Sequence, residues 1–167
     1  MVKIVTAAAV CRQGKVLVAR RAPGQAHQGK WEFPGGKLEP GEDEGACLER
    51  ELWEELGMRG RTGIHLADSP YDYGQGRILL RAYLFNWQEG GPELRVHDKL
   101  AWAGPEALSA LDFTPADLPI ARRVSAYLTQ SKGEGEDCPG ADAPPAQSDG
   151  ETREARPACE GLREEKR

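Results

Sequence analysis

The fold and the chemistry of this chain are decided by residues 35–57, which read GGKLEPGEDEGACLERELWEELG. In the second half of this stretch a leucine recurs every fourth residue from Leu48 to Leu56, and Gly57 follows. Large aliphatic residues at this spacing are typical of one face of a helix, and a glycine commonly ends one. The sequence therefore predicts a helix over residues 44–56 that is entered from a glycine-rich loop.

Three carboxylates share one side of the predicted helix. Glu51, Glu54 and Glu55 stand at positions i, i+3 and i+4, next to the leucine stripe, so they are expected at the edge of the buried face. Like charges at these spacings cost roughly 0.2–0.5 kcal/mol per pair in an isolated helix. A cation is expected to relieve them, and carboxylate oxygens without His or Cys favour Mg²⁺, with Mn²⁺ as the alternative.

A solvated acidic face is the competing interpretation, because most runs of charge are solvated. The approach to the helix weighs against it. Gly35 and Gly36 let a backbone carbonyl come close to a metal or a phosphate, and Glu42 adds a further carboxylate.

The rest of the chain predicts a mixed fold. Gln13-Gly14 is a turn signal between the apolar stretch 3–12 and the stretch 15–21, in which apolar and polar residues alternate, so a hairpin is expected there. A last helix is expected from about Pro119. Strands are expected at residues 3–12, 15–21, 77–87 and 100–103. Because strands and helices alternate without a repeated βαβ rhythm, we expect an α+β fold with layers around a mixed β-sheet.

Composition limits the function classes. The 167 residues are 39% hydrophobic and 29% charged, which fits one globular domain. No apolar run approaches membrane-spanning length, and the N-terminal residues lack the pattern of a signal peptide, so we expect a cytoplasmic protein. Residues 1–130 carry 17 acidic and 16 basic side chains, a net charge of −1. Stable binding to DNA or RNA would require a basic excess.

The C-terminal part has a different composition. Residues 131–167 are rich in Gly, Pro, Ala, Asp and Glu, and Leu162 is their only large aliphatic residue. Such a segment has too little apolar surface to offset the entropy lost on ordering. We expect a folded domain over 1–130 and a disordered, low-complexity tail over 131–167.

The spacing of the fixed residues resembles the signature of the Nudix family. The matching positions are Gly36, Glu42, Arg50-Glu51-Leu52, Glu54-Glu55 and Gly57-Met58. The similarity to the MutT-like branch extends to Arg20-Arg21, to residues 31–37, to His97-Asp98 with Trp102, and to residues 113–119. The resemblance implies an α/β/α sandwich and a metal-dependent hydrolase of nucleoside diphosphates linked to another group.

The resemblance also implies the roles of the central residues. Glu54 and Glu55 would bind the divalent metal, assisted by the main-chain carbonyl of Gly35 or Gly36. Glu51 would contribute to the metal site and would orient or deprotonate the attacking water. Such a site neutralises the polyphosphate and lowers the pKa of bound water.

Supporting roles follow from the same resemblance. Arg50 would hold the glutamates in place as their ion-pair partner, and Glu42 would support the metal site. Arg21 would contact phosphate, and Phe33 and Asp117 would contact the rest of the substrate. Asp117 alternatively caps the last helix, since Asp is a favoured N-cap and a proline follows.

One position departs from the family pattern. MutT relatives often place a further metal-binding glutamate six residues before the tryptophan, and here that position is Val96. Asp98 is the expected substitute in the metal site, with Glu93 further back as another option. Asp98 is equally interpreted as a turn residue.

The expected activity is hydrolysis of a nucleoside triphosphate to a monophosphate and pyrophosphate, with oxidised nucleotides such as 8-oxo-dGTP foremost. The alternative substrates are CTP, dCTP and 5-methyl-dCTP, because an ionised Asp117 accepts hydrogen bonds only and suits a base with an exocyclic amine. A protonated Asp117 would restore the guanine option. A nucleotide-sensing Nudix module without catalysis is the rival of another class. A monomer or a homodimer is expected.

Overall fold

The computed structural model describes residues 2–134 and 153–154. In chain order the elements are β1 (Val2–Ala9), β2 (Cys11–Arg12), β3 (Lys15–Arg21), β4 (Trp31–Glu32), α1 (Glu44–Leu56), β5 (Arg59–Asp72), β6 (Arg77–Glu89), β7 (His97–Ala103), α2 (Pro105–Ala110), α3 (Leu118–Glu134) and β8 (Arg153–Glu154).

The strands form two sheets. In the first, β6 lies between β1 and β5, parallel to β1 and antiparallel to β5. In the second, β3 pairs antiparallel with β2, β4 and β7, and β7 pairs with β8. The chain crosses from the first sheet to the second at Val10, between β1 and β2. The mixed sheet and the helices confirm the α+β class.

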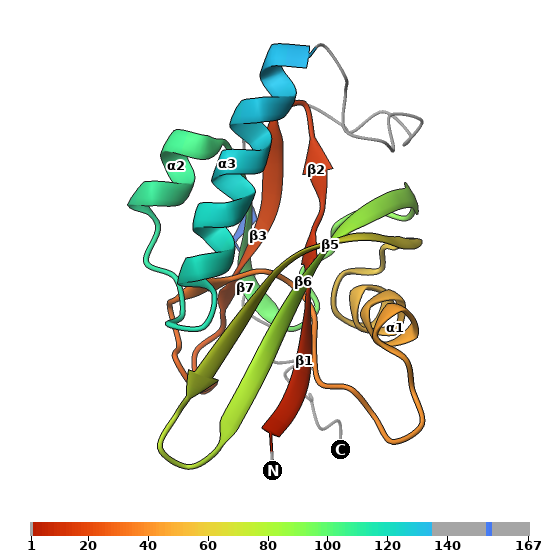
Figure 1. Cartoon of the computed structure of the whole chain (residues 1–167), viewed down its shortest axis with the longest axis vertical. Coiled ribbons are helices and arrows are strands. Elements are labelled where there is room, and N and C mark those ends of the chain that lie inside the picture. The colour runs from red at the N-terminus through yellow and green to blue at the C-terminus, as the bar shows by residue number, and fades with distance from the viewer. Residues whose placement is uncertain (1, 135–152, 155–167) are drawn as a thin grey trace, which may run out of the picture.

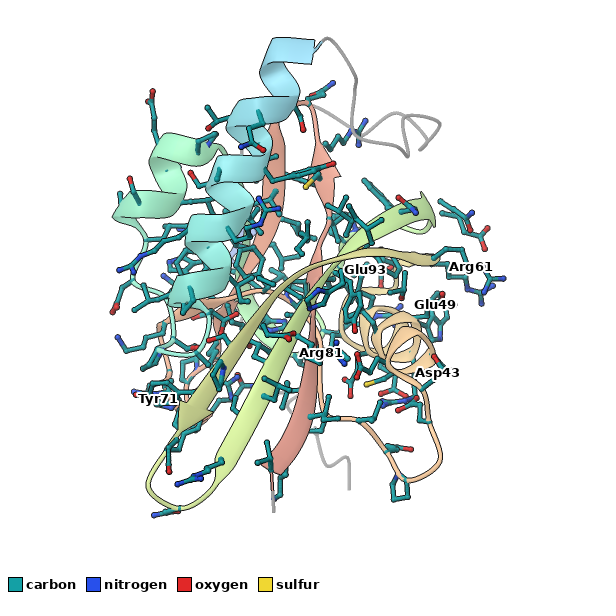
Figure 2. The ribbon with its side chains drawn as sticks, viewed as in Figure 1. Asp43, Glu49, Arg61, Tyr71, Arg81 and Glu93 are labelled. Carbon is teal, nitrogen blue, oxygen red and sulfur yellow. The ribbon has the colours of Figure 1, made fainter. Side chains whose placement is uncertain are left out.

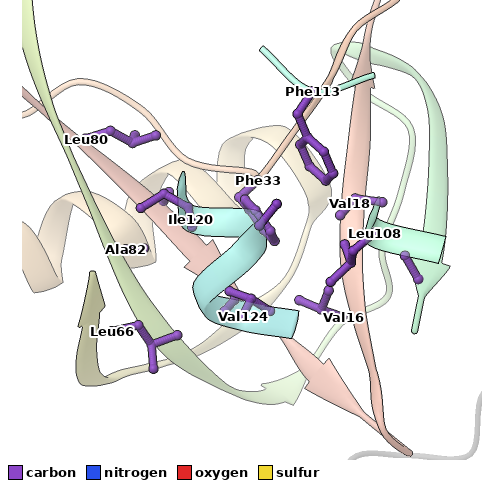
Figure 3. Packing of buried hydrophobic residues seen from close by; sticks show 14 of the residues in the cluster. Val16, Val18, Phe33, Leu66, Leu80, Ala82, Leu108, Phe113, Ile120 and Val124 are labelled. Carbon is purple, nitrogen blue, oxygen red and sulfur yellow. The ribbon is translucent and has the colours of Figure 1, made fainter. Parts of the chain in front are cut away.

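Helices cover both faces of the sheets: α2 and α3 lie on one side and α1 lies on the other (Figure 1). The alternation of side chains along a strand produces this arrangement. In β3, Val16 and Val18 belong to the core under α2 and α3, whereas Leu17 belongs to the core under α1. Figure 3 shows the first core, in which Ile120 and Val124 of α3 pack among residues of the strands.

Helix α1 has the bounds that the sequence predicts. The carboxylate of Asp43 accepts a hydrogen bond from the N–H of Ala46 at 2.9 Å and so caps the first turn. Gly57 ends the helix in the left-handed conformation, with φ of +65°. The leucine stripe from Leu48 to Leu56 is fully buried, and the half-buried Glu51 and Glu55 lie along its edge.

Other elements differ from the prediction. The expected strand 3–12 is two strands in two sheets, and β7 begins three residues before the expected residue 100. The sequence did not predict β5, because register shifts on both sides of His65 break the alternation of buried and exposed residues along it.

The predicted domain end at residue 130 falls inside α3, which continues to Glu134. Arg153–Glu154 pairs antiparallel with β7. The rest of the tail predicted over 131–167 lies outside the described residues. Among the residues that the structure describes, no helix is long and apolar enough to cross a membrane.

Candidate active site

Arg50 of α1 gathers three of the candidate glutamates. Its Nε and Nη2 donate to the two carboxylate oxygens of Glu42 at 2.8 and 3.0 Å. Its Nη1 donates to Glu51 at 3.0 Å and to Glu54 at 3.3 Å. The hydrogen bonds from Arg50 lower the pKa of Glu42 to about 2. The planar guanidinium thus fixes the carboxylates around it, which is the arrangement that the resemblance implies.

Glu55 points to a different neighbourhood. Its carboxylate accepts a hydrogen bond from the N–H of Gly35 at 3.3 Å. Burial raises the pKa of Glu55 to about 7, the charge of His97 opposes the rise, and Glu32 and Glu51 add to it. A buried carboxyl among other carboxyls is stabilised in its ionised form by a nearby cation.

The two glycines before α1 allow close approach of the loop to the helix. A Cβ on Gly36 would collide with the carboxylate of Glu51. Gly35 has φ of +149°, and a Cβ there would collide with the backbone oxygen of Thr6 in β1. A side chain at Gly35 would push the loop away from β1, whereas one at Gly36 would displace the carboxylate of Glu51.

The carbonyls of this loop face alternate directions. Those of Pro34 and Gly36 accept hydrogen bonds from Ala8 and Thr6 of β1, each at 2.8 Å. The carbonyl of Gly35 lies between them along the chain and therefore faces away from β1. Of the two predicted carbonyl ligands, that of Gly35 is the better placed, because the carbonyl of Gly36 is already engaged.

The donor chemistry of this edge fits a hard divalent cation, because it offers several carboxylates and a backbone carbonyl. The half-buried Glu55 makes no ion pair with Lys or Arg among the described residues. Within residues 2–134 and 153–154, no three Asp, Glu, His or Cys side chains converge as a ready-made metal centre. The hydrogen bonds explain this, because Arg50 holds three glutamates while Glu55 turns towards Gly35.

A second cluster lies at the end of β3. Nη1 of Arg21 donates to Glu32 at 2.6 Å, and Nε of Arg21 donates to the carbonyl of Ala26 at 2.5 Å. The other oxygen of Glu32 lies 3.0 Å from Nε2 of His97. Burial acts to raise the pKa of Glu32, but the hydrogen bond from His97 and the charge of Arg21 leave it below its usual value. Arg21, the predicted phosphate ligand, is therefore held by an ionised carboxylate.

Asp98 is not joined to the glutamates of α1. It falls at the register shift between β3 and β7, where Arg20 pairs with Lys99 and Arg21 pairs with His97. Nε and Nη2 of Arg20 donate to the two oxygens of Asp98 at 2.8 and 3.0 Å. Metal binding by Asp98 would compete with this bidentate ion pair. Val96, where relatives often have a glutamate, is 40% exposed, and its carbonyl accepts from Gln25 at 3.2 Å.

Asp117 lies at the start of α3 and contacts Phe33. Its carboxylate accepts from the N–H of Phe33 at 3.0 Å and from the hydroxyl of Thr114 at 2.5 Å. Its carbonyl accepts from Ala121 at 2.8 Å, so its backbone occupies the N-cap position. Burial raises the pKa of Asp117 to about 7, and the two hydrogen bonds oppose the rise.

Aromatic rings surround this end of the site. The rings of Tyr71 and Tyr73 are 4.6 Å apart, and that of His27 is 5.2 Å from Tyr73. Burial raises the pKa of Tyr73, and Thr114 and Asp117 are among the groups that act on it. Figure 2 shows Tyr71 at the end of β5, beside the start of α3. Aromatic rings near a carboxyl group are suited to stacking on a flat heterocycle and binding its polar edge.

The sequence suggested no role for Glu32, His97 or Thr114. Glu32 and His97 stand inside stretches that resemble the MutT-like branch, and that was the available signal. Their contact depends on the pairing of β3 with both β4 and β7.

The outer face of α1 does not contribute to these clusters. Glu49 forms an ion pair with Arg61 of β5 at 3.0 Å, and the two side chains lie together beside α1 in Figure 2. Glu44 forms an ion pair with Arg81 of β6 at 2.6 Å. These contacts fix the helix to the first sheet and leave its other edge facing the glycine loop.

Comparison with known proteins shows which family this chain matches. The family model described as "NUDIX domain" matches residues 2–124. The chain is 38% identical over 117 residues to the CTP pyrophosphohydrolase of Escherichia coli (strain K12), covering 70% of this chain and 86% of that protein. It is 31% identical over 110 residues to the 8-oxo-dGTP diphosphatase of the same organism, covering 66% of this chain and 85% of the relative.

Solved structures show the same fold. The solution structure of the E. coli ORF135 protein superposes with a TM-score of 0.67 at 33% identity, covering 81% of this chain and 95% of that one. A MutT structure from a study of Aliivibrio salmonicida and Vibrio cholerae superposes with a TM-score of 0.65 at 24% identity, covering 76% of this chain and 99% of that one. The second likeness concerns the fold alone.

Proposed function

The chain belongs to the Nudix family of hydrolases, and from this premise we propose that it cleaves nucleoside triphosphates to a monophosphate and pyrophosphate with a divalent metal, Mg²⁺ before Mn²⁺. The observation that carries the proposal is the network of Arg50 with Glu42, Glu51 and Glu54, beside the half-buried Glu55. The site thus has a fixed set of carboxylates on one helix edge.

Glu51, Glu54 and Glu55 would hold the metal, together with the carbonyl of Gly35, and Glu42 would support the site through Arg50. The bound metal would neutralise the polyphosphate and lower the pKa of the attacking water. This neutralisation is needed because residues 1–130 have no excess of positive charge: their net charge is −1, and a nucleoside triphosphate carries about four negative charges.

The protein residues position the reactants. Arg50 keeps the glutamates in place, and Glu51 orients or deprotonates the attacking water. Arg21 contacts the phosphates from the opposite side of the site, held by Glu32. The nucleoside lies towards Phe33 and Asp117. The role of Asp98 as a metal ligand stays a prediction that an Asp98→Asn variant tests through metal affinity.

Two substrate classes follow from Asp117. With a pKa of about 7, this carboxyl is protonated in a large fraction of molecules near neutral pH and can then donate a hydrogen bond. The protonated form suits an oxidised guanine, as in 8-oxo-dGTP, and the ionised form suits the amine of a cytosine, as in CTP, dCTP or 5-methyl-dCTP. The relatives named for each substrate support both. We place 8-oxo-dGTP first and assign the enzyme to clearing the cytoplasmic nucleotide pool, as a monomer or a homodimer.

The test is a comparison of kcat/KM, by pyrophosphate release with Mg²⁺, across 8-oxo-dGTP, dGTP, CTP, dCTP, 5-methyl-dCTP, ADP-ribose and diadenosine polyphosphates. The proposal predicts that one of the two named triphosphate classes leads the series. Preference for ADP-ribose or a dinucleotide would refute the substrate class. Tight binding of a triphosphate without turnover would support the sensing module instead.

A further inference from the structure

His97 is the most unusual polar group near the site. Its side chain is 2% exposed, and its Nε2 lies 3.0 Å from Glu32. Its other ring nitrogen, Nδ1, is buried and has no hydrogen-bond partner among the described residues. A buried acceptor or donor without a partner is unfavourable and rare in folded proteins, so this orientation of the ring needs an explanation.

The hydrogen on Nε2 of His97 follows from its partner. The second oxygen of Glu32 accepts from Arg21 at 2.6 Å, and an ionised carboxylate accepts hydrogen bonds but cannot donate them. Nε2 must therefore carry a hydrogen, which it donates to Glu32. The contact with Glu32 decides the orientation of the ring, even though it leaves the other nitrogen unsatisfied.

The position of His97 is fixed from two sides. It pairs with Arg21 across β3 and β7, where the register shifts. The loop before it is tied to the end of α1, because Arg95 donates to the carbonyl of Trp53 at 2.7 Å and the N–H of Glu93 donates to the carbonyl of Leu56 at 2.9 Å. The ring is thus part of a rigid connection between α1 and the end of β3.

The connection ends at the guanidinium of Arg21. Nε and Nη1 of Arg21 are held by Ala26 and Glu32, and Nη2 makes no hydrogen bond within the described part of the chain. Two anchors fix the plane of a guanidinium and therefore the direction of the free nitrogen. Loss of the Glu32 anchor would leave Arg21 free to turn about its side-chain torsions.

We propose that His97 is a positioning residue for substrate phosphate: through its Nε2–H it fixes the Glu32 carboxylate, and Glu32 fixes the direction in which Arg21 presents Nη2. This inference rests on the proposed function, in which Arg21 binds the phosphates. It adds a histidine to the polyphosphate site and assigns its Nε2 as the donor to Glu32.

The test compares His97→Leu, which removes the donor, with His97→Gln, whose amide nitrogen can take the place of Nε2. His97→Leu should raise KM for the triphosphate about tenfold with a smaller change in kcat, and His97→Gln should restore KM to within about threefold. In an Arg21→Ala background, His97→Leu should have no further effect on KM, because the residue acts through Arg21. His65→Leu, on β5 and paired with Asp68, is the control and should behave as the wild type.

Two measurements keep the test independent of folding and of turnover. Thermal unfolding shows whether His97→Leu folds, and Glu32→Gln, which keeps the shape of the side chain, is the second variant and should raise KM in the same way. ¹⁵N NMR of the histidine ring, recorded without substrate, should show Nε2 protonated. An Nε2 that carries no hydrogen, an unchanged KM in folded His97→Leu, or a full His97→Leu effect in the Arg21→Ala background would overturn the proposal. A wild-type protein with no triphosphatase activity would refute the proposed function alone, since the NMR result would still report on His97.

Discussion

Replacing Asp117 by Asn should stabilise the protein, and more at alkaline than at acidic pH. The Asp117 side chain is buried between Phe33 and Thr114, and burial raises its pKa from 3.8 to about 7. Asn keeps both contacts: its Oδ1 accepts from the N–H of Phe33, and its Nδ2 donates to the hydroxyl of Thr114, which can also accept. The substitution therefore removes the cost of burying a charge without leaving a polar atom unpaired.

The sign and size follow from the two pKa values. The folded state binds the Asp117 proton more tightly than the unfolded state does, because the pKa is about 7 in the first and 3.8 in the second. The free energy of unfolding therefore falls as the pH rises from 3.8 to about 7. At ~1.4 kcal/mol for each tenfold change in proton affinity, wild type should be less stable than the Asn variant by about 4 kcal/mol at pH 8 and about 2 kcal/mol at pH 5.

Urea unfolding of both proteins at pH 5 and pH 8 measures this difference directly. Comparing the two proteins at each pH cancels the groups that titrate alike in both. Thr114→Val is the matched control: it removes the hydroxyl that donates to the carboxylate, should raise the pKa of Asp117 further, and should steepen the dependence on pH. A gap between wild type and Asp117→Asn that is the same at both pH values would refute the assignment of Asp117 as a buried, largely neutral acid.

The other predictions concern the catalytic edge of α1. Glu55→Gln and Glu54→Gln should each lower kcat by at least ~100-fold at saturating Mg²⁺ while far-UV circular dichroism stays that of the wild type, and unchanged kinetics in both would exclude metal binding there. Gly36→Ala should lower kcat with little loss of stability, because the added Cβ meets the movable carboxylate end of Glu51. Gly35→Ala should lower the melting temperature, because its Cβ meets the backbone of Thr6. Equal effects of the two substitutions on the melting temperature would contradict this. Arg50→Lys should raise the pKa of Glu42, which Arg50 lowers to about 2, and a ¹³C NMR titration measures this change. The reason is that the ammonium of lysine cannot hold several carboxylates at once as the planar guanidinium does.

The elements with regular local patterns could be predicted from the sequence. Helix α1 follows from the leucine spacing and from Gly57 at its end, and both the class of the fold and the family followed from the residues around it. The shared side of Glu51, Glu54 and Glu55 could be predicted as well, because these residues are neighbours on one helix.

What could not be predicted depends on strand register. The cluster of Glu32, His97 and Arg21 requires that β3 pair with β4 on one side and β7 on the other. The register shift at Asp98, whose side chain forms an ion pair with Arg20, leaves no trace in the local sequence. The burial of the Asp117 carboxylate is equally a long-range property, since its partner Phe33 is 84 residues away.

The most direct test of the account is ³¹P NMR of the products formed from 8-oxo-dGTP and CTP by the wild type and by Glu55→Gln, with Mg²⁺ and with EDTA. The account predicts monophosphate and pyrophosphate in equal amounts from at least one of the two nucleotides, no products in EDTA, and at least ~100-fold slower formation by the variant. Release of inorganic phosphate in place of pyrophosphate, turnover that persists in EDTA, or no hydrolysis of either nucleotide with Mg²⁺ would contradict it.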